Sequence, residues 1–323
     1  MSQGLTNNKP LAAAFGHHKC ASMWVHGICE QVCLDLGLRL GCVFDVRDFG
    51  GDLPRYVRER RVDFLLCGNA DFQQVAGLQA ENLRAFHYVR DPRDIVVSAY
   101  FSHRNSHSTE AWPELLEHRE KLRSCTKEQG LFLELESRAQ QFQEMRSWKD
   151  LAADGSIRSY KIEDVIAKPY ETFLEIFDSL GLLDQEYYSA SNRLRFLLAK
   201  VSGRLEQLLG SSVHLPRAIR ALPKERLLGI VHERDFFKLS GGRRQGQADP
   251  GSHYRRGVHG DWLNHFSVEH LQFFKQRYGD LVLQYGYETD VDWDRRYLPI
   301  IQQRLRSPQR FDVRQQALAG PSA

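Results

Sequence analysis

The feature that most constrains the fold is an apolar run near the N-terminus that passes through a short polar loop into a helical pattern. Residues 11–15 are apolar and predict a short buried strand, and beyond the loop apolar residues recur at Ile28, Val32 and Leu36, the spacing of one helical face. The loop holds Lys19 and small residues. Backbone N–H groups and the positive end of the helix dipole can therefore converge on one anion there. This order of elements predicts a phosphate-binding turn.

The turn differs from the loop of the common nucleoside triphosphatases. No Gly-x-x-x-x-Gly-Lys-Ser/Thr sequence precedes the helix, and no magnesium-binding hydroxyl follows Lys19. An ordinary strand-to-helix turn with an exposed lysine is the alternative interpretation, and the loop by itself does not decide between the two.

Composition narrows the class of protein. The chain has 323 residues, of which 42% are hydrophobic, which is ample for a large core. Its net charge of +3 is nearly balanced and argues against a general nucleic-acid binder. The six cysteines lack Cys-x-x-Cys spacing, so neither a zinc site nor a disulfide framework is favoured. No membrane span or secretory signal is recognisable, and we expect a cytoplasmic protein.

Strand and helix patterns alternate along the first half of the chain. Further strands are expected at residues 40–46, 62–67, 85–89 and 156–162, and helices at residues 53–61, 113–122, 131–145 and 169–180. This alternation predicts an α/β fold: a single P-loop-like three-layer domain with a central parallel sheet, helices on both faces and ligand sites at the carboxyl ends of the strands. We expect a flexible segment at 1–9, the domain at 10–293 and a partly disordered C-terminal extension at 294–323.

Two further stretches carry anion-binding chemistry. Arg90 stands at the end of the fourth predicted strand, and Ser98 lies on the helix that follows. A guanidinium and a hydroxyl on one helix edge suit a phosphate monoester. Far downstream, Arg255, Arg256 and Gly257 follow a polar, glycine-rich loop and precede a helix, and they predict a second anion site on a closing segment.

At these residues the chain resembles the sulfotransferases that use 3'-phosphoadenosine 5'-phosphosulfate (PAPS), of the cytosolic type also found in bacteria. That family has a Pro-Lys-Ser-Gly-Thr-Thr-Trp loop, an Arg-x-Pro-x-Asp-x-x-x-Ser segment and an Arg-Lys-Gly-x-x-Gly-Asp-Trp-x-x-x-Phe segment. The second is matched here from Arg90 to Ser98 and the third from Arg255 to Phe266. The resemblance covers roughly residues 10–293.

The resemblance implies a role for each matching residue. Lys19 should contact the bridging oxygen and the sulfuryl group, and the backbone that follows it should hold the 5'-phosphate. Trp24 should stack on adenine and Phe236 should line the adenine pocket. The residues that the resemblance implies for donor binding are Lys19, Cys20, Ala21, Ser22, Met23, Trp24, Arg90, Ser98, Phe236, Arg255, Arg256 and Gly257.

The catalytic base departs from the family pattern. Cytosolic members carry a histidine after the third strand, whereas this chain has Asn69, which cannot take up a proton at neutral pH. His18, which replaces the family proline beside the lysine, is the first candidate, and Asp48, just after the second strand, is the second. His103 and His107 come third.

We therefore expect an enzyme that moves a sulfuryl group from PAPS to a hydroxyl of a small-molecule or carbohydrate acceptor. Lys19 would stabilise the leaving phosphate during an in-line transfer that needs no metal. The polar segment at 102–110 favours a sugar, a glycolipid or a polar natural product as acceptor. A small-molecule kinase and a non-catalytic nucleotide-binding relative are the alternatives, and a homodimer is left open.

Overall fold

The structure, a computed structural model, describes residues 10–78, 82–110, 112–150, 157–184 and 219–306, with a few residues between 194 and 205. The chain divides into two compact units, Met1–Val89 with Asp150–Asp235 and Arg90–Lys149 with Phe236–Ala323. We call them the sheet unit and the helical unit and describe each by itself. The predicted flexible segment 1–9 and residues 307–323 of the predicted extension lie outside the described residues.

The sheet unit is built on five parallel strands in the order β2-β3-β1-β4-β5. The strands are β1 (Leu11–Phe15), β2 (Leu40–Val43), β3 (Phe64–Cys67), β4 (Leu83–Val89) and β5 (Ile157–Lys161). Every residue of β1 is buried, as expected for a central strand covered on both faces. The predicted parallel sheet is confirmed.

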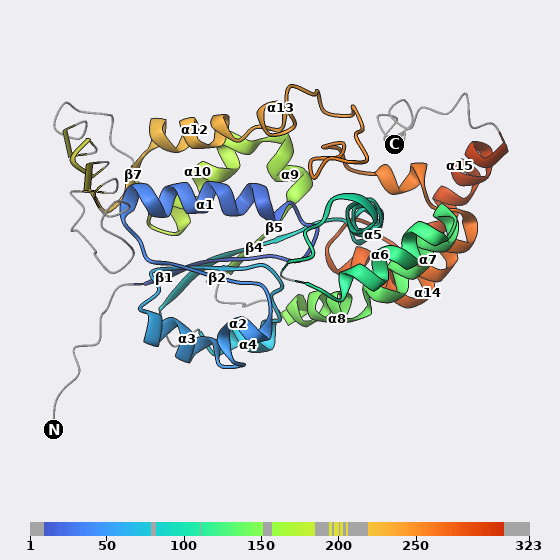
Figure 1. Cartoon of the computed structure of the whole chain (residues 1–323), viewed down its shortest axis with the longest axis horizontal. Coiled ribbons are helices and arrows are strands. Elements are labelled where there is room, and N and C mark those ends of the chain that lie inside the picture. Colours follow the sequence, from blue (N-terminus) through green and yellow to red (C-terminus); the bar gives the residue numbers. More distant parts are fainter. Residues whose placement is uncertain are drawn as a thin grey trace. The chain divides into compact units, whose positions relative to one another are not determined.

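Helices cover both faces of this sheet, with α1, α10 and α12 over one face and α2, α3 and α4 over the other (Figure 1). The helices of the unit are α1 (Ser22–Leu36), α2 (Val46–Phe49), α3 (Leu53–Arg60), α4 (Phe72–Ala76), α9 (Ile162–Ala167), α10 (Pro169–Ser179) and α12 (Lys224–Glu233). A short pair of parallel strands, β6 (Leu183–Asp184) and β7 (Leu222–Pro223), completes the unit.

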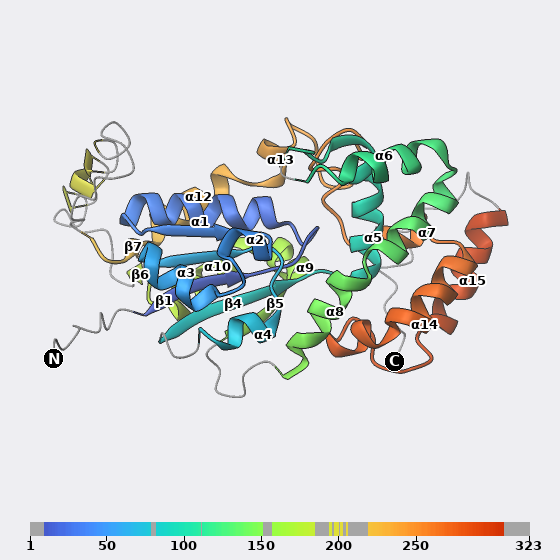
Figure 2. The same ribbon diagram turned by 60° about the horizontal axis from the view of Figure 1, so that its bottom comes forward.

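The helical unit is a cluster of helices of which α14 and α15 are the longest (Figure 2). Its elements are α5 (Pro92–Phe101), the π-helical turn η2 (Ser102–Ser106), α6 (Leu115–Ser124), α7 (Lys127–Ser137), α8 (Ala139–Ser147), the 3-10 turn η3 (Trp148–Asp150), which runs into the sheet unit, α13 (Phe236–Leu239), the 3-10 turn η4 (Asp261–Asn264), α14 (Val268–Gln284) and α15 (Asp294–Arg306).

One sequence expectation is wrong in detail. The helix expected over 131–145 is two helices, because the backbone at Arg138 leaves the helical region, with φ −85° and ψ 0°. At the other end of the unit, Arg304 on α15 donates hydrogen bonds to the carbonyls of Leu263 at 2.7 Å and Phe266 at 2.5 Å. Those two contacts anchor the end of the helix to the turn that precedes α14.

Among the helices that the structure describes, none has the length and the apolar composition needed to span a bilayer.

Candidate active site

The loop between β1 and α1 makes a tight turn with a strained backbone. The N–H of Cys20 donates to the carbonyl of His17 at 3.1 Å, which closes the turn. Lys19 and Ala21 lie in the left-handed region, with φ of 66° and 59°. Side chains disfavour this conformation, and non-glycine residues that adopt it cluster at functional sites. A left-handed residue before a right-handed helix turns successive N–H groups to one side, which is the geometry of an anion-binding nest.

The N-terminus of α1 is open. Its N-cap residue, Ala21, has no side-chain hydrogen bond to the helix, and its carbonyl accepts from the N–H groups of Trp24 at 3.0 Å and Val25 at 3.2 Å. The N–H groups of Ser22 and Met23 have no carbonyl of the preceding turn to bind, as at every helix start. A 15-residue helix with an uncapped N-terminus is a favourable place for a phosphate.

The other loop residues contribute in different ways. Cys20 is buried, so the loop can use its backbone but not its thiol. Met23 is 56% exposed. Trp24, for which the resemblance implies stacking on adenine, is half-buried and packs its ring edge-to-face on Phe173 at 5.3 Å. The contact with Phe173 thus fixes one edge of the indole against the core of the sheet unit.

A glycine permits the close approach of the loop to the sheet. A Cβ on Gly16 would lie 2.0 Å from Cζ of Tyr88, so only glycine fits beneath that ring. The Tyr88 hydroxyl in turn lies 3.1 Å from Nε2 of His26, and burial raises the pKa of Tyr88 well above its ordinary value. Neither contact can be predicted from the sequence, because each joins β4 to a distant part of the chain, Gly16 in the loop or His26 on α1.

A buried histidine pair joins the loop to β4. The Nε2 atoms of His17 and His87 are 2.9 Å apart, and Nδ1 of His87 is 2.9 Å from Oγ of Ser159. Burial lowers the pKa of His17 to about 3, and burial together with His17 lowers the pKa of His87 well below its ordinary value. Both rings are therefore neutral near pH 7, and one donates to the other.

Asn69 and Asp48 both have structural partners. Asn69 donates to the carbonyl of Phe44 at 2.9 Å and accepts the N–H of His18 at 3.0 Å, so it ties the loop to the chain that follows β2. Asp48 is exposed, and its Oδ2 accepts from the N–H groups of Phe44 at 2.7 Å and Asp45 at 2.9 Å, which caps α2. The Asp48 carboxylate is thus engaged in holding a helix start.

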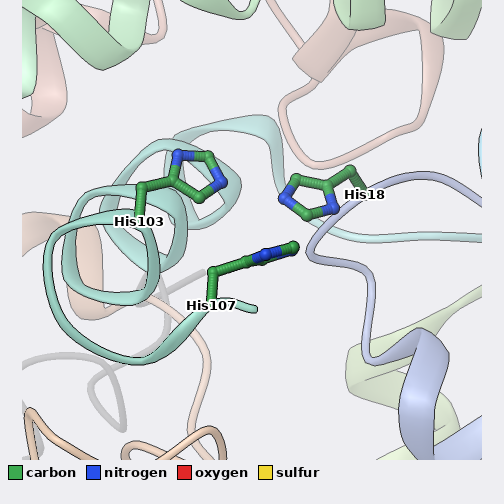
Figure 3. A group of neighbouring side chains, drawn as sticks. All are labelled: His18, His103 and His107. Atoms are coloured by element: carbon green, nitrogen blue, oxygen red, sulfur yellow. The ribbon is translucent and has the colours of Figure 1, made fainter. Parts of the chain in front are cut away.

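The three histidines considered as bases differ in environment. His103 is fully buried and donates from Nδ1 to Glu134 at 2.8 Å, and His107 donates from Nδ1 to the carbonyl of Ser108 at 2.7 Å. Figure 3 shows His103 and His107 at the π-helical turn, and His18 on the loop that follows β1. His18 is half-buried.

In the helical unit, Arg90 and Ser98, the residues expected to bind a phosphate monoester, lie just before and on α5. Arg90 and Ser98 are both half-buried, and Asp91 caps the helix by accepting the N–H of Arg93 at 2.9 Å. The Arg93 guanidinium is buried and donates to Asp91 at 2.7 Å and to Glu288 at 2.6 Å, so it is a structural arginine. The predicted strand, turn and helix are present.

One carboxylate joins two of the sequence motifs. Asp94, on the first turn of α5, accepts the N–H of Gly260 at 2.6 Å and the N–H of Trp262 at 2.9 Å. The segment that holds Arg255 and Arg256 is thereby fixed to the helix that carries Ser98.

Arg255 and Arg256 share one acidic partner. Both guanidinium groups pair with Asp261, whose side chain is 1% exposed. Burial alone would raise the pKa of Asp261, but His265 and Arg255 hold it below its ordinary value. Within the described part of the chain, Nε of Arg256 is buried and has no hydrogen-bond acceptor. Sequence analysis missed the role of Asp261, although its place after Gly260 in the third motif was a signal.

The loop before these arginines is more ordered than its composition indicated. Arg243 donates to the carbonyls of Tyr254 at 2.7 Å and Arg255 at 3.0 Å, and to Oγ of Ser252 at 2.8 Å. Further on, Gly257 has φ 67°, and a Cβ there would lie 2.7 Å from the ring of Phe236.

The chain matches the sulfotransferase domain family over residues 75–286. No curated protein matches it in sequence. Solved structures that resemble it include mouse sulfotransferase SULT7A1 complexed with PAP, at 15% identity over 90% of this chain and 87% of that chain, with a TM-score of 0.49.

Two structures of retinol dehydratase also match. The complex with retinol and PAP shares 14% identity over 85% of this chain and 83% of that chain, with a TM-score of 0.45. The complex with androsterone and inactive cofactor PAP shares 13% identity over 85% and 82%, with a TM-score of 0.44.

Because the family match spans more than half of its length, the chain belongs to the sulfotransferase domain family. The prediction of a sulfotransferase is confirmed at that level.

Proposed function

We propose that this sulfotransferase takes its sulfuryl group from PAPS and transfers it to a hydroxyl of a small-molecule or carbohydrate acceptor. The observation that carries the proposal is the uncapped N-terminus of α1, with left-handed Ala21 before it and Lys19 beside it. A terminal phosphosulfate supplies a group that leaves with growing negative charge on a phosphate oxygen. A helix start and a lysine stabilise charge of that kind.

The sheet unit supplies the groups proposed for the 5'-phosphosulfate. The N–H groups of Ala21, Ser22 and Met23 bind the phosphate, and the ammonium group of Lys19 neutralises the oxygen that leaves. The buried, neutral pair of His17 and His87 links the loop to β4 without adding charge.

The helical unit supplies the groups proposed for the 3'-phosphate. Arg90, Ser98, Arg255 and Arg256 bind it, together with the N–H of Gly257. The buried Nε of Arg256, which has no acceptor among the described residues, supports an anion at this position. Phe236, which lies against Gly257, is proposed to contact adenine.

Of the candidate bases, we propose His18. Asp48 is occupied as a helix cap, and His103 is buried against Glu134. A pH–rate profile tests the choice. His18→Gln should remove the acidic limb of the profile and lower kcat, whereas Asp48→Asn should keep the limb. A limb that disappears in Asp48→Asn and not in His18→Gln would contradict the assignment.

The polar residues of segment 102–110 do not by themselves select one class of acceptor. Two of the polar residues in this segment, Ser102 and His103, are buried inside the protein. We therefore propose only a hydroxyl acceptor, to be found by screening phenols, sterols, sugars and glycolipids with labelled PAPS.

Lys19→Ala tests the reaction itself. The variant should fold normally and lose turnover by a factor on the order of 10² to 10⁴. Lys121→Ala, at an exposed lysine of the helical unit, is the matched control and should keep full activity. If the parent binds 3'-phosphoadenosine 5'-phosphate (PAP) but transfers a sulfuryl group to no acceptor, the chain is a non-catalytic relative instead.

Discrimination between two nucleotides tests the 3'-phosphate groups. The parent should bind PAP more tightly than AMP, which lacks the 3'-phosphate, and Arg256→Gln should shrink that ratio by about tenfold or more. Arg295→Gln, whose side chain is 76% exposed, is the control. An unchanged ratio in Arg256→Gln would remove Arg256 from the site.

A further inference from the structure

A second constellation of side chains lies inside the helical unit, and the proposed reaction does not use it. His103 from η2, His118 from α6 and Glu134 from α7 each offer one ligand atom, and these atoms all lie within 4.8 Å of one another. Nδ1 of His103 and Nε2 of His118 each lie 2.8 Å from the same oxygen, Oε1 of Glu134. Three separate elements thus bring two imidazoles and a carboxylate to one point.

The surrounding residues bury most of this cluster of His103, His118 and Glu134. His103 and Glu134 are fully buried, and the side chain of His118 is 20% exposed. Trp112 packs its ring edge-to-face on His103 at 5.3 Å. The only described member open to solvent is therefore His118, which gives an entry path for an ion.

The backbone at His103 is unusual. His103 lies on a π-helical turn, a rare conformation that is frequent at functional sites. Arg119 supports the turn by donating from Nε to the carbonyl of His103 at 2.7 Å. The wider turn places the imidazole of His103 toward α6 and α7, where His118 and Glu134 meet it.

The spacing is close to that of a metal site. Ligands at 2.0–2.2 Å from Zn²⁺ in a tetrahedral arrangement are roughly 3.3 Å apart. Each nitrogen-to-oxygen distance here is 2.8 Å, so an opening of roughly half an ångström would admit the ion. His118, the most exposed of the three, can supply that movement by a small side-chain rotation.

The charges are also compatible. Arg138 approaches the other oxygen, Oε2 of Glu134, at 3.7 Å, and Ser137 donates to Oε2 at 3.3 Å. Oε1 is therefore the oxygen left for an ion, and the carboxylate separates the ion from the guanidinium. On binding, each imidazole moves its proton to its other ring nitrogen, and the two hydrogen bonds to Oε1 are replaced by metal bonds.

We propose that His103, His118 and Glu134 form a structural binding site for one divalent transition ion, with Zn²⁺ the ion that best suits two imidazoles and a carboxylate. Bound there, the ion links η2, α6 and α7 and stabilises the helical unit. This site is independent of the donor-binding residues, so it stands whether or not PAPS is the donor.

No local pattern in the sequence marks this site. The three ligands are widely separated along the chain, with 16 residues from His118 to Glu134 and 31 from His103 to Glu134. Zinc motifs that can be recognised in a sequence have their paired ligands two to five residues apart.

The test is a competition titration of the metal-free, full-length protein with Zn²⁺ against a chromophoric chelator. The variant is His118→Gln, which removes the most exposed ligand. The control is His232→Gln, whose side chain is 60% exposed and which removes an imidazole elsewhere. We expect His118→Gln to bind Zn²⁺ at least about tenfold more weakly than the control, because loss of a ligand costs no less than loss of its supporting contact.

A second measurement does not depend on any variant. X-ray absorption at the zinc edge of the parent protein with one equivalent of Zn²⁺ should show two imidazoles and a carboxylate oxygen. Equal affinity in His118→Gln and His232→Gln, a spectrum with sulfur ligands, or no binding by the parent would each overturn the proposal.

Discussion

Acidification should destabilise the sheet unit through histidines that are buried in the neutral form. His26 is 3% exposed, and burial lowers its pKa to about 4. In the unfolded chain its pKa returns to about 6.5. Below pH 6.5 the unfolded state therefore binds a proton that the folded state does not, and stability falls as the pH falls toward 4.

The size of this effect follows from the two pKa values. At pH 5 the unfolded histidine is almost fully protonated and the folded one is almost fully neutral, so the loss between pH 7 and pH 5 is about 2 kcal/mol for His26. His17, with a pKa of about 3, adds a loss of similar size. Partners hold the pKa values of Asp261 and Glu134 below their ordinary values despite burial, so these carboxylates titrate below this window.

Urea unfolding at pH 7 and pH 5, followed by circular dichroism, measures the difference. His26→Gln removes one titrating group, so it should lose about 2 kcal/mol less than the parent between the two pH values. His232→Gln, at an exposed position, should lose as much as the parent. If His26→Gln loses as much stability as the parent, the buried neutral state of His26 is refuted.

Three further predictions concern packing and the arginine cluster. Gly16→Ala forces a Cβ to within 2.0 Å of the Tyr88 ring and should lower the free energy of unfolding by about 1–3 kcal/mol; an unchanged urea midpoint would mean that the ring moves aside freely. Arg93→Met removes the buried cation that Asp91 and Glu288 share, although Glu288 keeps Arg296 and the Tyr297 hydroxyl as partners. It should lower the free energy of unfolding by about 3 kcal/mol, and an unchanged thermal midpoint would count against this expectation. Asp261→Asn should weaken PAP binding about tenfold in calorimetry and leave AMP binding nearly unchanged, since its carboxylate positions both arginines; equal losses for the two nucleotides would point to a folding defect.

Local patterns predicted the elements of the sheet unit well. β1 has the expected bounds, residues 11–15, because these five apolar residues lie between Pro10 and Gly16 and suit a strand that is buried on both faces. The strand order could not be predicted, since pairing of β1 with both β3 and β4 depends on long-range contacts. The prediction of a single helix over 131–145 is wrong because the apolar residues keep their helical spacing across Arg138, whereas the backbone leaves the helical conformation at that residue.

The residues proposed to be functional could be predicted only where a sequence motif contains them. The lysine loop and the two arginine segments follow from spacing and resemblance, whereas the partners that hold them do not. Asp261, Asp94 and the pair of His17 with His87 act across the fold, and no local pattern marks such contacts. Asp48 is the opposite example: its position after the second strand suggested a catalytic carboxylate, but in the structure its side chain caps α2.

The most direct test of the central claim is isothermal titration of the protein with PAP, set beside ATP with magnesium. Saturable binding of one PAP per chain, weakened in Arg90→Ala and much tighter than that of ATP, is the result predicted for a PAPS-dependent sulfotransferase. Binding of ATP with magnesium and none of PAP would contradict the proposal and indicate a kinase.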